Sequence, residues 1–594
     1  MYRNESLEQA LSHVDVVSFD IFDTLLIRPY VDANDFYRVL GILKGRRSFS
    51  KRRIRAQVIA HKKHRESDPT LDDIYSLIPD FEDLKQWELE LRTSTLLLNP
   101  ELLKVLDYAV AQGKKIAIIS DMYISSSYLK ELLRQKGVSR WDGFYLSNEH
   151  NGRKSNGKLY DVFLKDFKVA PEKILHIGDN YRSDVLMANQ KGIIAYYYPR
   201  VSDKFIGDNY FAQRYLRQHD SISRRCLIGA LAAGWHCYQY ANSELGYFER
   251  VGFLYGGVLG YAYASFVANE ARRRGIKRLL LVYRDGYNLE PIFNKLYPDL
   301  KTTLIYAPRK TYFYASKDFT DKPHMIEARR KMVWRELSMS GNEQEFLKAG
   351  TLSKDNAVKF ETASQRARTE YLLYIKSLGI DNPAEVALVD MTTSALSATR
   401  LIENTLGKTI TSFYLLTYKP GLKKLPPSVV PMFHAHGSSI ILTLMSEFLF
   451  TAPTPSVVGV ENGQPIYDDA GGFFDKFKSG VCEVVRPAIV QGACALSDAR
   501  VEISRGDLLD YFEAFHAAVT PRDESEFSFA REATGIEQRE GRSPLQPELR
   551  CIRPVFRLFG RVVLSVRVWT RQMRRYVTFY FIGRVPILRI RLPF

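Results

Sequence analysis

The feature that most constrains the fold is a series of short apolar runs, each ending at a polar or acidic loop. In the first 200 residues these runs cover 14–19, 114–120, 144–149, 174–179 and 193–198. Helical stretches separate them, and strands that alternate with helices form βαβ units and a parallel sheet. The carboxyl ends of parallel strands meet at one edge, where such folds place their ligands. The sequence therefore predicts an α/β fold with a site made from these loops.

Four places in this region suit a single chemistry. They are Asp20 and Thr24 in DIFDT, Ser120 and Asp121 in SDMY, Lys154 in GRKSNGKLY, and Asp179 and Asp184 in GDNYRSD. A carboxylate can attack a phosphoryl group if a cation screens the repulsion between two anions, and oxygen ligands suit Mg²⁺ better than zinc. Each residue alone would more often be a turn, helix-cap or solvated residue. Helix capping alone does not readily explain why all four motifs occur in this order along the chain.

These four motifs resemble the haloacid dehalogenase (HAD) superfamily over about residues 14–200. The resemblance implies a Rossmann-like sheet with a small helical cap at about 30–110, and a Mg²⁺-dependent aspartyl-phosphate mechanism. It implies Asp20 as the nucleophile and Ser120 and Lys154 as catalytic groups that contact the phosphoryl oxygens. The implied metal ligands are Asp20, Asp179, Asp184 and the backbone carbonyl of Phe22, and the implied substrate contacts are Thr24 and Asp121.

Phe22 departs from the superfamily's pattern. The usual residue is a second aspartate that serves as acid and base for the leaving group, and its loss costs about 10²–10⁴ in rate. Asp23 is adjacent but is expected to point the other way if the strand continues. Dehalogenases of the superfamily also carry an aromatic residue here, yet they need no metal-binding acid pair like Asp179 and Asp184. We therefore expect a metal-dependent hydrolase that is slow or restricted in its substrates.

The chain is too long for one core, because single domains stop growing near ~250–300 residues. The predicted units are 1–205 (HAD-like domain), 206–470 (second α/β domain), 471–548 (helical segment and polar linker) and 549–594 (basic tail). Strand-like runs at 276–286, 302–308, 385–391 and 411–418 mark the second domain. Residues 419–470 are rich in Pro and Gly and are expected to be irregular.

Four charged residues lie at or just beyond the predicted strand ends of the second domain: Arg284, Asp285, Arg309 and Asp390. They could form a second anion- or sugar-binding site, or they could pair structurally as charged loop residues. Glu447 is expected to be structural.

A narrower resemblance rests on FDIFDTLLIRP, SDMY, RKSNGKLYDVFL and LLLVYRDGYNLEPIF. These segments are similar to large bacterial HAD hydrolases associated with capsule or O-antigen biosynthesis. That implies a phosphorylated sugar or a lipid-linked glycan intermediate as substrate. Two alternatives stay open: a glycan-assembling transferase with its main activity in the second domain, and a catalytically weak HAD scaffold that recruits glycosyltransferases to the membrane. The group's V-D-I-G-W-x-G element is only partly present at 389–394.

The charge of the chain is concentrated at its end. Lys and Arg number 84 against 67 Asp and Glu, a net charge of +17, and residues 549–594 hold eleven arginines and no acid. Without the tail the net charge falls to about +6. Because no known nucleic-acid motif organises these arginines, nucleic acid is a poor candidate partner, and an anionic membrane surface is the expected one. A basic helix and β-hairpin packed on the second domain is the alternative.

The cellular compartment is also predicted. The five cysteines form no close pairs, and the N-terminus has no apolar signal core. The sequence contains no run of about 18 apolar residues, so we expect no conventional membrane span. We expect a cytoplasmic protein, peripheral on the inner face of the plasma membrane.

Overall fold

The computed structural model describes residues 7–242, 245–316, 323–380, 382–393, 396–418, 425–435, 442, 446, 448–468 and 473–518, and the backbone of 564–568, 575–582 and 585–591. Two compact units emerge: Met1–Leu245 with Ala495–Asp507, and Gly246–Cys494 with Leu508–Phe594. The predicted linker at 521–548 lies outside the described residues. Within the predicted tail the backbone forms an antiparallel sheet of β15 (Leu564–Val568), β16 (Arg575–Ile582) and β17 (Val585–Arg591).

The first unit is built on a five-stranded parallel sheet, as predicted. Its strands are β1 (Val16–Phe19), β4 (Lys115–Ser120), β5 (Gly143–Leu146), β6 (Ile174–Gly178) and β7 (Ile194–Tyr197), in the order β5-β4-β1-β6-β7. This is a doubly wound order, and it reverses between β1 and β6. Tyr160, Phe163 and Ala188 pack a helical layer onto one face of the sheet.

The helices that connect these strands follow the predicted βαβ pattern. They are α6 (Pro100–Ala111), α7 (Ser126–Gln135), α8 (Lys158–Phe167) and α9 (Met187–Gln190), with short turns η2 (Lys154–Asn156), η3 (Pro171–Lys173) and η4 (Tyr181–Leu186) and an N-terminal α1 (Leu7–Ser12).

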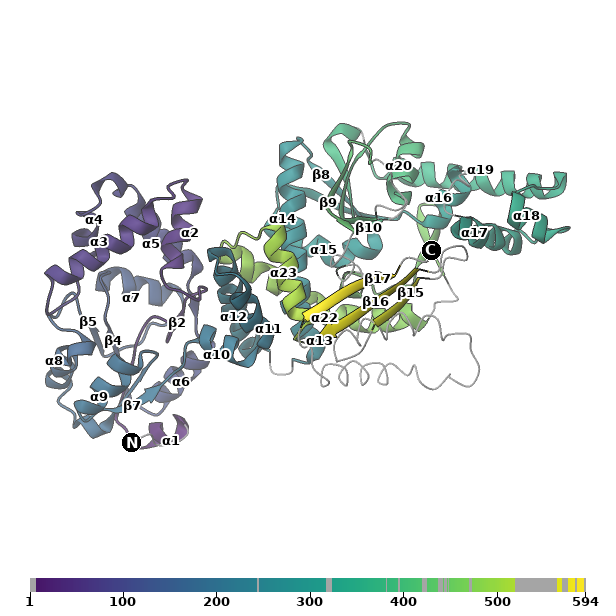
Figure 1. Ribbon diagram of the computed structural model, residues 1–594. Helices are drawn as coiled ribbons and strands as arrows, with labels where there is room; N and C mark the ends of the chain where they lie inside the picture. The colour runs from purple at the N-terminus through teal and green to yellow at the C-terminus, as the bar shows by residue number, and fades with distance from the viewer. Residues whose placement is uncertain are drawn as a thin grey trace. The chain divides into compact units, whose positions relative to one another are not determined.

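A helical insertion separates β1 from β4. It comprises α2 (Asp35–Leu43), α3 (Phe49–Lys63), α4 (Leu71–Tyr75), η1 (Pro79–Phe81) and α5 (Leu84–Thr95). The two short strands β2 (Leu26–Ile27) and β3 (Leu97–Leu98) pair antiparallel and close its base. Figure 1 shows these helices gathered together, apart from α8 and α9. We call α2–α5 the cap.

Three helices after the first sheet remain with the first unit: α10 (Val201–Asp208), α11 (Tyr210–Gln218) and α12 (Ile222–Ala241). In α12, His236 Nε2 hydrogen-bonds Asn99 Oδ1 at 3.0 Å, and Arg225 forms an ion pair with the buried Asp35 of the cap. The boundary at residue 205 stays a prediction, and these contacts extend the packing of the first unit past it.

The second unit contains another parallel sheet, in the order β12-β11-β10-β8-β9. Its strands are β8 (Arg278–Val282), β9 (Lys301–Ile305), β10 (Val386–Thr393), β11 (Thr411–Tyr418) and β12 (Val429–Ala435). The expectation that 419–470 is irregular was wrong, because it contains β12 and the hairpin β13 (Val457–Glu461) and β14 (Gln464–Tyr467). Proline is tolerated at a sheet edge, and Pro431 lies in the edge strand β12.

The helices of the second unit are α13 (Tyr247–Val251), η5 (Gly252–Gly256), α14 (Gly257–Arg273), α15 (Tyr283–Leu296), α16 (Arg309–Ser316), α17 (Pro323–Glu336), α18 (Glu343–Ala349), α19 (Lys354–Ser377), η6 (Pro383–Glu385), α20 (Ser397–Leu406), α22 (Phe473–Asp498) and α23 (Arg505–His516), the last two of which run across the division between the units. The continuous run Tyr247–Arg273 is long and apolar enough to cross a membrane by length and composition, but 83% of its apolar window is buried inside the protein. A core helix has the same character.

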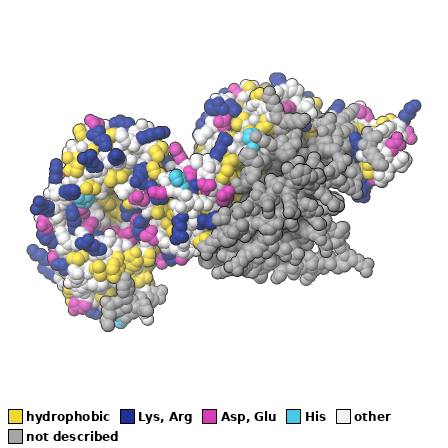
Figure 2. Space-filling model, in the orientation of Figure 1, with side chains coloured by type: hydrophobic (Ala, Val, Ile, Leu, Met, Phe, Trp, Pro, Cys, Tyr) yellow, Lys and Arg dark blue, Asp and Glu magenta, His cyan; other side chains and the backbone are white. Residues whose placement is uncertain are grey.

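Charges on the visible face of the first unit are mixed. Figure 2 shows Lys and Arg side chains dispersed there among Asp and Glu side chains. The mixed charges on this face are consistent with the sequence, in which most of the basic excess lies in the tail.

The close approach of α12 to the start of the cap yields a stability prediction. A Cβ at Gly229 would lie 2.6 Å from Tyr30 Cα and 2.8 Å from the Pro29 carbonyl oxygen, both backbone atoms. We expect Gly229→Ala to destabilise the first unit by about 1–3 kcal/mol. The control is Gly207→Ala in α10, which meets nothing within 4 Å and gains helix propensity. Calorimetry of the full chain measures both, and equal melting temperatures for the two variants would contradict this packing.

Candidate active site

The carboxyl edge of the first sheet brings most of the predicted site residues together. Asp20 directly follows β1, Asp179 directly follows β6, and Ser120 is the last residue of β4. The backbone N–H of Asp20 donates to the Ile177 carbonyl of β6 at 2.9 Å. Asp20 and Asp179 therefore flank the point where the strand order reverses, which is the usual ligand crevice of such a sheet.

Lys154 is the buried cation of this edge. Its Nζ lies 2.7 Å from Asp20 Oδ1 and 2.6 Å from Asp184 Oδ1, and its residue is only 2% exposed. Burial disfavours the charged form, but Asp184 and Asp20 outweigh burial and raise the pKa of the Lys154 ammonium well above its usual value. The ammonium is therefore charged at any ordinary pH, and it joins two carboxylates from different loops.

Asp184 is held by a hydrogen-bonding network in η4. Its Oδ2 accepts from the Asn180 N–H at 2.9 Å, and its Oδ1 contacts His176 Nε2 at 3.4 Å. Burial would raise the pKa of Asp184, but Lys154 and His176 outweigh burial and hold that pKa below its usual range. The carboxylate is therefore ionised and fixed in place.

His176 is a site residue that the sequence reasoning missed. It lies in β6 and is fully buried, and its Nδ1 contacts Ser18 Oγ of β1 at 2.9 Å. Burial lowers the pKa of His176, which favours a neutral ring between Ser18 and Asp184. The available signal was a histidine two residues before Gly178 in an otherwise apolar strand.

Gly178 permits the close packing of Asp184 against β6. A Cβ at Gly178 would lie 2.3 Å from Asp184 Oδ2. The glycine of the GD pair is thus a steric requirement of the site.

Asp20, Asp179 and Asp184 form a compact acidic group. One ligand atom from each lies within 4.8 Å of the other two. Burial, Asp20 and Asp23 raise the pKa of Asp179 to about 8, while Arg28 opposes the rise. One ammonium among three acids leaves the group short of positive charge, and a bound cation would supply that charge and favour the ionised form of Asp179. An all-oxygen donor set of this kind fits Mg²⁺.

The remaining predicted residues surround this group. Thr24 is fully buried, and its Oγ1 has no hydrogen-bond partner among the described residues, so the hydroxyl remains available to a ligand. Ser120 is buried at the strand end. Asp121 accepts from the backbone N–H of Lys154 at 2.7 Å, and burial raises its pKa to about 6. Asp121 therefore positions the Lys154 loop, and its substrate contact stays a prediction.

Phe22 and Asp23 leave no acid in the usual acid/base position. The Phe22 ring is buried, with the Arg28 guanidinium 5.7 Å from its centroid. Asp23 has a positive φ of 54° and pairs with Arg28 at 2.6 Å and with Arg200 at 3.3 Å. The Asp23 carboxylate is thus engaged in ion pairs, and because β1 ends at Phe19 the continued strand on which its expected direction depended is not formed.

A buried polar cluster ties the cap to the loop after β4. Arg53 and Glu88 are fully buried and form a two-point ion pair at 2.8 and 2.9 Å, and Arg92 pairs with Glu88 at 3.2 Å. Tyr123, three residues after Ser120, donates to Glu88 at 3.1 Å and accepts from Arg92. Two guanidinium groups against one carboxylate leave one excess positive charge buried within the cap.

A second contact joins the cap to the Lys154 loop. Asp68, between α3 and α4, pairs with Arg153 at 2.9 Å and accepts from Ser147 Oγ. Arg153 also donates to the Ser67 carbonyl at 2.6 Å. The loops that carry Ser120 and Lys154 are therefore both attached to the cap, so movement of the cap would displace the catalytic loops.

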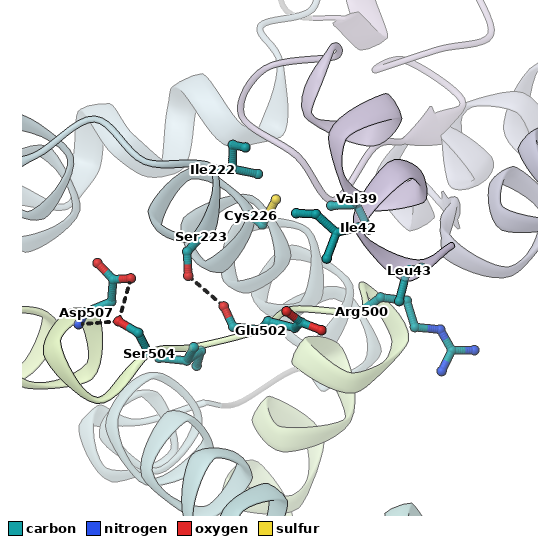
Figure 3. Close-up of a pocket in the computed structure, with 11 residues that line it drawn as sticks. Val39, Ile42, Leu43, Ile222, Ser223, Cys226, Arg500, Glu502, Ser504 and Asp507 are labelled. Carbon is teal, nitrogen blue, oxygen red and sulfur yellow. Dashed lines mark hydrogen bonds between the residues drawn. The ribbon is translucent and has the colours of Figure 1, made fainter. Parts of the chain in front are cut away.

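A separate pocket of about 360 Å³ lies between α2, α12 and residues 500–507 (Figure 3). Ser223 donates to the Glu502 carbonyl at 2.6 Å, and Ser504 and Asp507 bond each other at 2.9 Å. Val39, Ile42 and Leu43 line its other side. The lining includes none of the predicted site residues, and we assign it no role.

In the second unit, Asp285 and Asp390 come together with Arg309 nearby. Arg284 lies at the start of α15, where its guanidinium reaches Ser456 Oγ at 3.5 Å. Glu447 lies outside the described residues.

Comparison with known proteins agrees with this geometry. Residues 14–192 match a family model described as haloacid dehalogenase-like hydrolase. This part of the chain is similar in sequence to HAD-like hydrolases. Three similar solved structures are an uncharacterised protein from Listeria monocytogenes serotype 4b, the L-2-haloacid dehalogenase from Xanthobacter autotrophicus, and a haloacid dehalogenase-like family hydrolase from Xanthomonas campestris. A search of curated proteins finds no match.

The structural likenesses cover limited parts of this chain. Identities are 24%, 15% and 16%, with TM-scores of 0.16, 0.27 and 0.25, in the same order. The matches cover 17%, 37% and 32% of this chain, and 60%, 88% and 82% of the other chains. The chain thus spans less than two thirds of the Listeria protein that it matches.

The acidic group leads to a metal-binding prediction. We expect saturating Mg²⁺ to raise the melting temperature of the wild-type first unit by roughly 2–4 °C, because a ligand that binds only the folded state stabilises it. Asp179→Asn should abolish this shift. In metal-free buffer the same variant should be at least as stable as wild type, because it removes a carboxylate that repels Asp20.

The matched control for this measurement is Asp161→Asn, whose exposed carboxylate pairs with Lys191 outside the group. Calorimetry with and without Mg²⁺ measures all three proteins. An unchanged Mg²⁺ shift in Asp179→Asn would show that the cation binds elsewhere.

Proposed function

We propose that the first unit is a Mg²⁺-dependent phosphohydrolase that uses Asp20 as its nucleophile. The observation that carries this proposal is the buried Lys154 ammonium, within 2.7 Å of Asp20 Oδ1 and 2.6 Å of Asp184 Oδ1. This arrangement places an ammonium against the attacking carboxylate and supplies positive charge where a phosphoryl group would develop negative charge.

The metal would be held by oxygen atoms alone. Asp20, Asp179 and Asp184 are the supporting side chains, and the Phe22 carbonyl would be a further ligand. Bound Mg²⁺ would screen the repulsion between the nucleophile and an anionic phosphoryl group.

The chemical step follows from the positions of these side chains. An Asp20 carboxylate oxygen forms a bond to phosphorus, and the bond from phosphorus to the ester oxygen of the substrate breaks. Ser120, Thr24 and Lys154 would bind the phosphoryl oxygens during this transfer. Water then attacks the phosphorus of the aspartyl-phosphate, releasing inorganic phosphate and regenerating the Asp20 carboxylate.

Phe22 restricts the substrates of such an enzyme. The departing oxygen receives no proton from residue 22, and the Asp23 carboxylate is paired with Arg28 and Arg200. Leaving groups that are stable as anions, or that bring their own proton donor, would therefore react fastest. The proposed enzyme should discriminate strongly by the acidity of the leaving group.

The proposed substrate is a sugar phosphate or a related glycan intermediate of bacterial surface polysaccharide biosynthesis. Support comes from the resemblance of FDIFDTLLIRP and LLLVYRDGYNLEPIF to the capsule and O-antigen group. The positive excess that Arg53, Arg92 and Glu88 bury within the cap suits an anionic substrate.

A phosphatase panel tests this function directly. With Mg²⁺, we expect turnover of some phosphate esters, faster for p-nitrophenyl phosphate than for alkyl phosphates, and a loss of at least about 10³-fold in Asp20→Asn because no nucleophile remains. Asp161→Asn is the control and should match wild type. If no phosphate is hydrolysed although Mg²⁺ still binds, the transferase and the scaffold functions gain support and hydrolysis is excluded.

We further propose that the tail, residues 549–594, attaches the protein to the inner face of the plasma membrane, where it would meet lipid-linked glycans and glycosyltransferases. The support is compositional: eleven arginines, no acid, and apolar residues beside most arginines. Basic residues near an anionic surface contribute about 1 kcal/mol each, and apolar side chains add attachment that salt does not screen.

Vesicle sedimentation tests the tail. The full chain should pellet with anionic vesicles but less with neutral ones, and the chain truncated after Glu548 should stay in the supernatant. High salt should weaken attachment without abolishing it. Equal sedimentation of the two proteins, or tight binding of RNA in place of lipid, would contradict membrane attachment through the tail.

A further inference from the structure

The second sheet has its own topological switch point. In chain order its strands lie 5-4-3-1-2, so β8 leads to β9 on one side while β10 lies on the other side. The crevice between the carboxyl ends of β8 and β10 is where an open sheet of this type binds its ligand. The match to a known family ends at residue 192, so it does not extend to this crevice.

Two acids meet at this crevice. Asp285 is the third residue of α15, directly beyond β8, and Asp390 follows Val389, the last residue of β10 paired with β8. Asp390 is partly exposed, and the carboxyl of Asp285 lies close enough to interact with its own. Burial and Asp285 raise the pKa of Asp390 well above its usual value, and Arg309 opposes the rise. The neighbouring Asp285 carboxyl therefore disfavours the ionised form of Asp390.

The backbone holds this pair in position. The Asp390 Oδ1 accepts from the Met391 N–H at 2.9 Å, and Tyr263 Oη donates to the Asp390 carbonyl at 2.7 Å from α14. Two carboxyl groups in contact are unfavourable for folding unless one is protonated, and an Asn at either position would avoid the cost. Such an arrangement is typical of a binding or reactive site.

Aromatic rings extend from the acid pair. The Tyr283 ring, at the start of α15, lies 5.1 Å from the Tyr306 ring beyond β9 and 6.1 Å from the Tyr287 ring. The Arg486 guanidinium stacks over Tyr287 at 3.9 Å. All three tyrosines are partly exposed. The crevice thus combines hydrogen-bonding carboxyls, the nearby Arg309 and a row of aromatic rings.

We propose that the β8–β10 crevice of the second unit binds a sugar, whose hydroxyls bond Asp285 and Asp390 and whose ring lies against Tyr283 and Tyr306. Two neighbouring carboxyl groups offer several acceptor oxygens, and a protonated carboxyl also donates, which suits hydroxyl groups. Its negative charge disfavours a phosphate, and Arg309 disfavours a metal ion. Aromatic rings provide the apolar surface that the C–H face of a sugar requires.

Saturation-transfer NMR on the full chain tests this site. The probes are free hexoses, 6-deoxyhexoses, N-acetylhexosamines and uronic acids, with UDP and AMP as separate samples. We expect transfer to the ring protons of at least one sugar. Affinity should fall about tenfold or more in Asp390→Asn and in Asp285→Asn, because each removes a charged hydrogen-bonding partner.

Two control variants test whether the sugar binds at this crevice. Asp299→Asn removes an exposed carboxylate that pairs with Arg272 in the same unit, and it should bind like wild type. Asp20→Asn should also bind like wild type, so failure of the proposed phosphatase leaves this result unaffected. The site is refuted by no transfer to any sugar, by transfer to nucleotides alone, by unchanged binding in both folded crevice variants, or by loss of binding in Asp20→Asn.

Discussion

The first unit depends on one buried ammonium. Lys154 neutralises Asp20 and Asp184, which reach it from the ends of β1 and from the turn after β6. Removing one member of a buried ion pair typically costs about 3–5 kcal/mol, because its partner is left charged without compensation. The same contact therefore stabilises the edge of the sheet and holds Asp20, the proposed nucleophile, in place. The cap attaches to the loops on both sides of this contact through Tyr123 and Arg153.

Both units use the same geometric principle with different chemistry. Each has a parallel sheet whose strand order reverses, and each places two acids across the reversal: Asp20 with Asp179, and Asp285 with Asp390. In the first unit a lysine and a proposed cation balance the charge. In the second unit Arg309 lies near the two acids, and the proposed ligand is a neutral hydroxyl-rich ring in place of a phosphate.

The sequence predicted the first sheet and the convergence of its loops because alternating apolar runs and polar ends are local features. Contacts across the fold are not local. The sequence spacing reveals neither the contact of His176 with Asp184 nor the approach of Asp285 to Asp390. The strand containing Pro431 was missed because proline suggested a loop, whereas an edge strand tolerates it. The pairing of Asp23 with Arg200 joins residues far apart in sequence, so it too required the structure.

The most direct test of the central claim is to find the phosphoryl group on its predicted acceptor. Full-length protein would be mixed with Mg²⁺ and p-nitrophenyl phosphate, quenched in acid during turnover, digested and analysed by mass spectrometry. A nucleophilic Asp20 predicts one added phosphoryl group on the peptide that contains Asp20, and none in Asp20→Asn. Turnover with that peptide unmodified, or with the phosphoryl group on a different residue, would contradict the role assigned to Asp20.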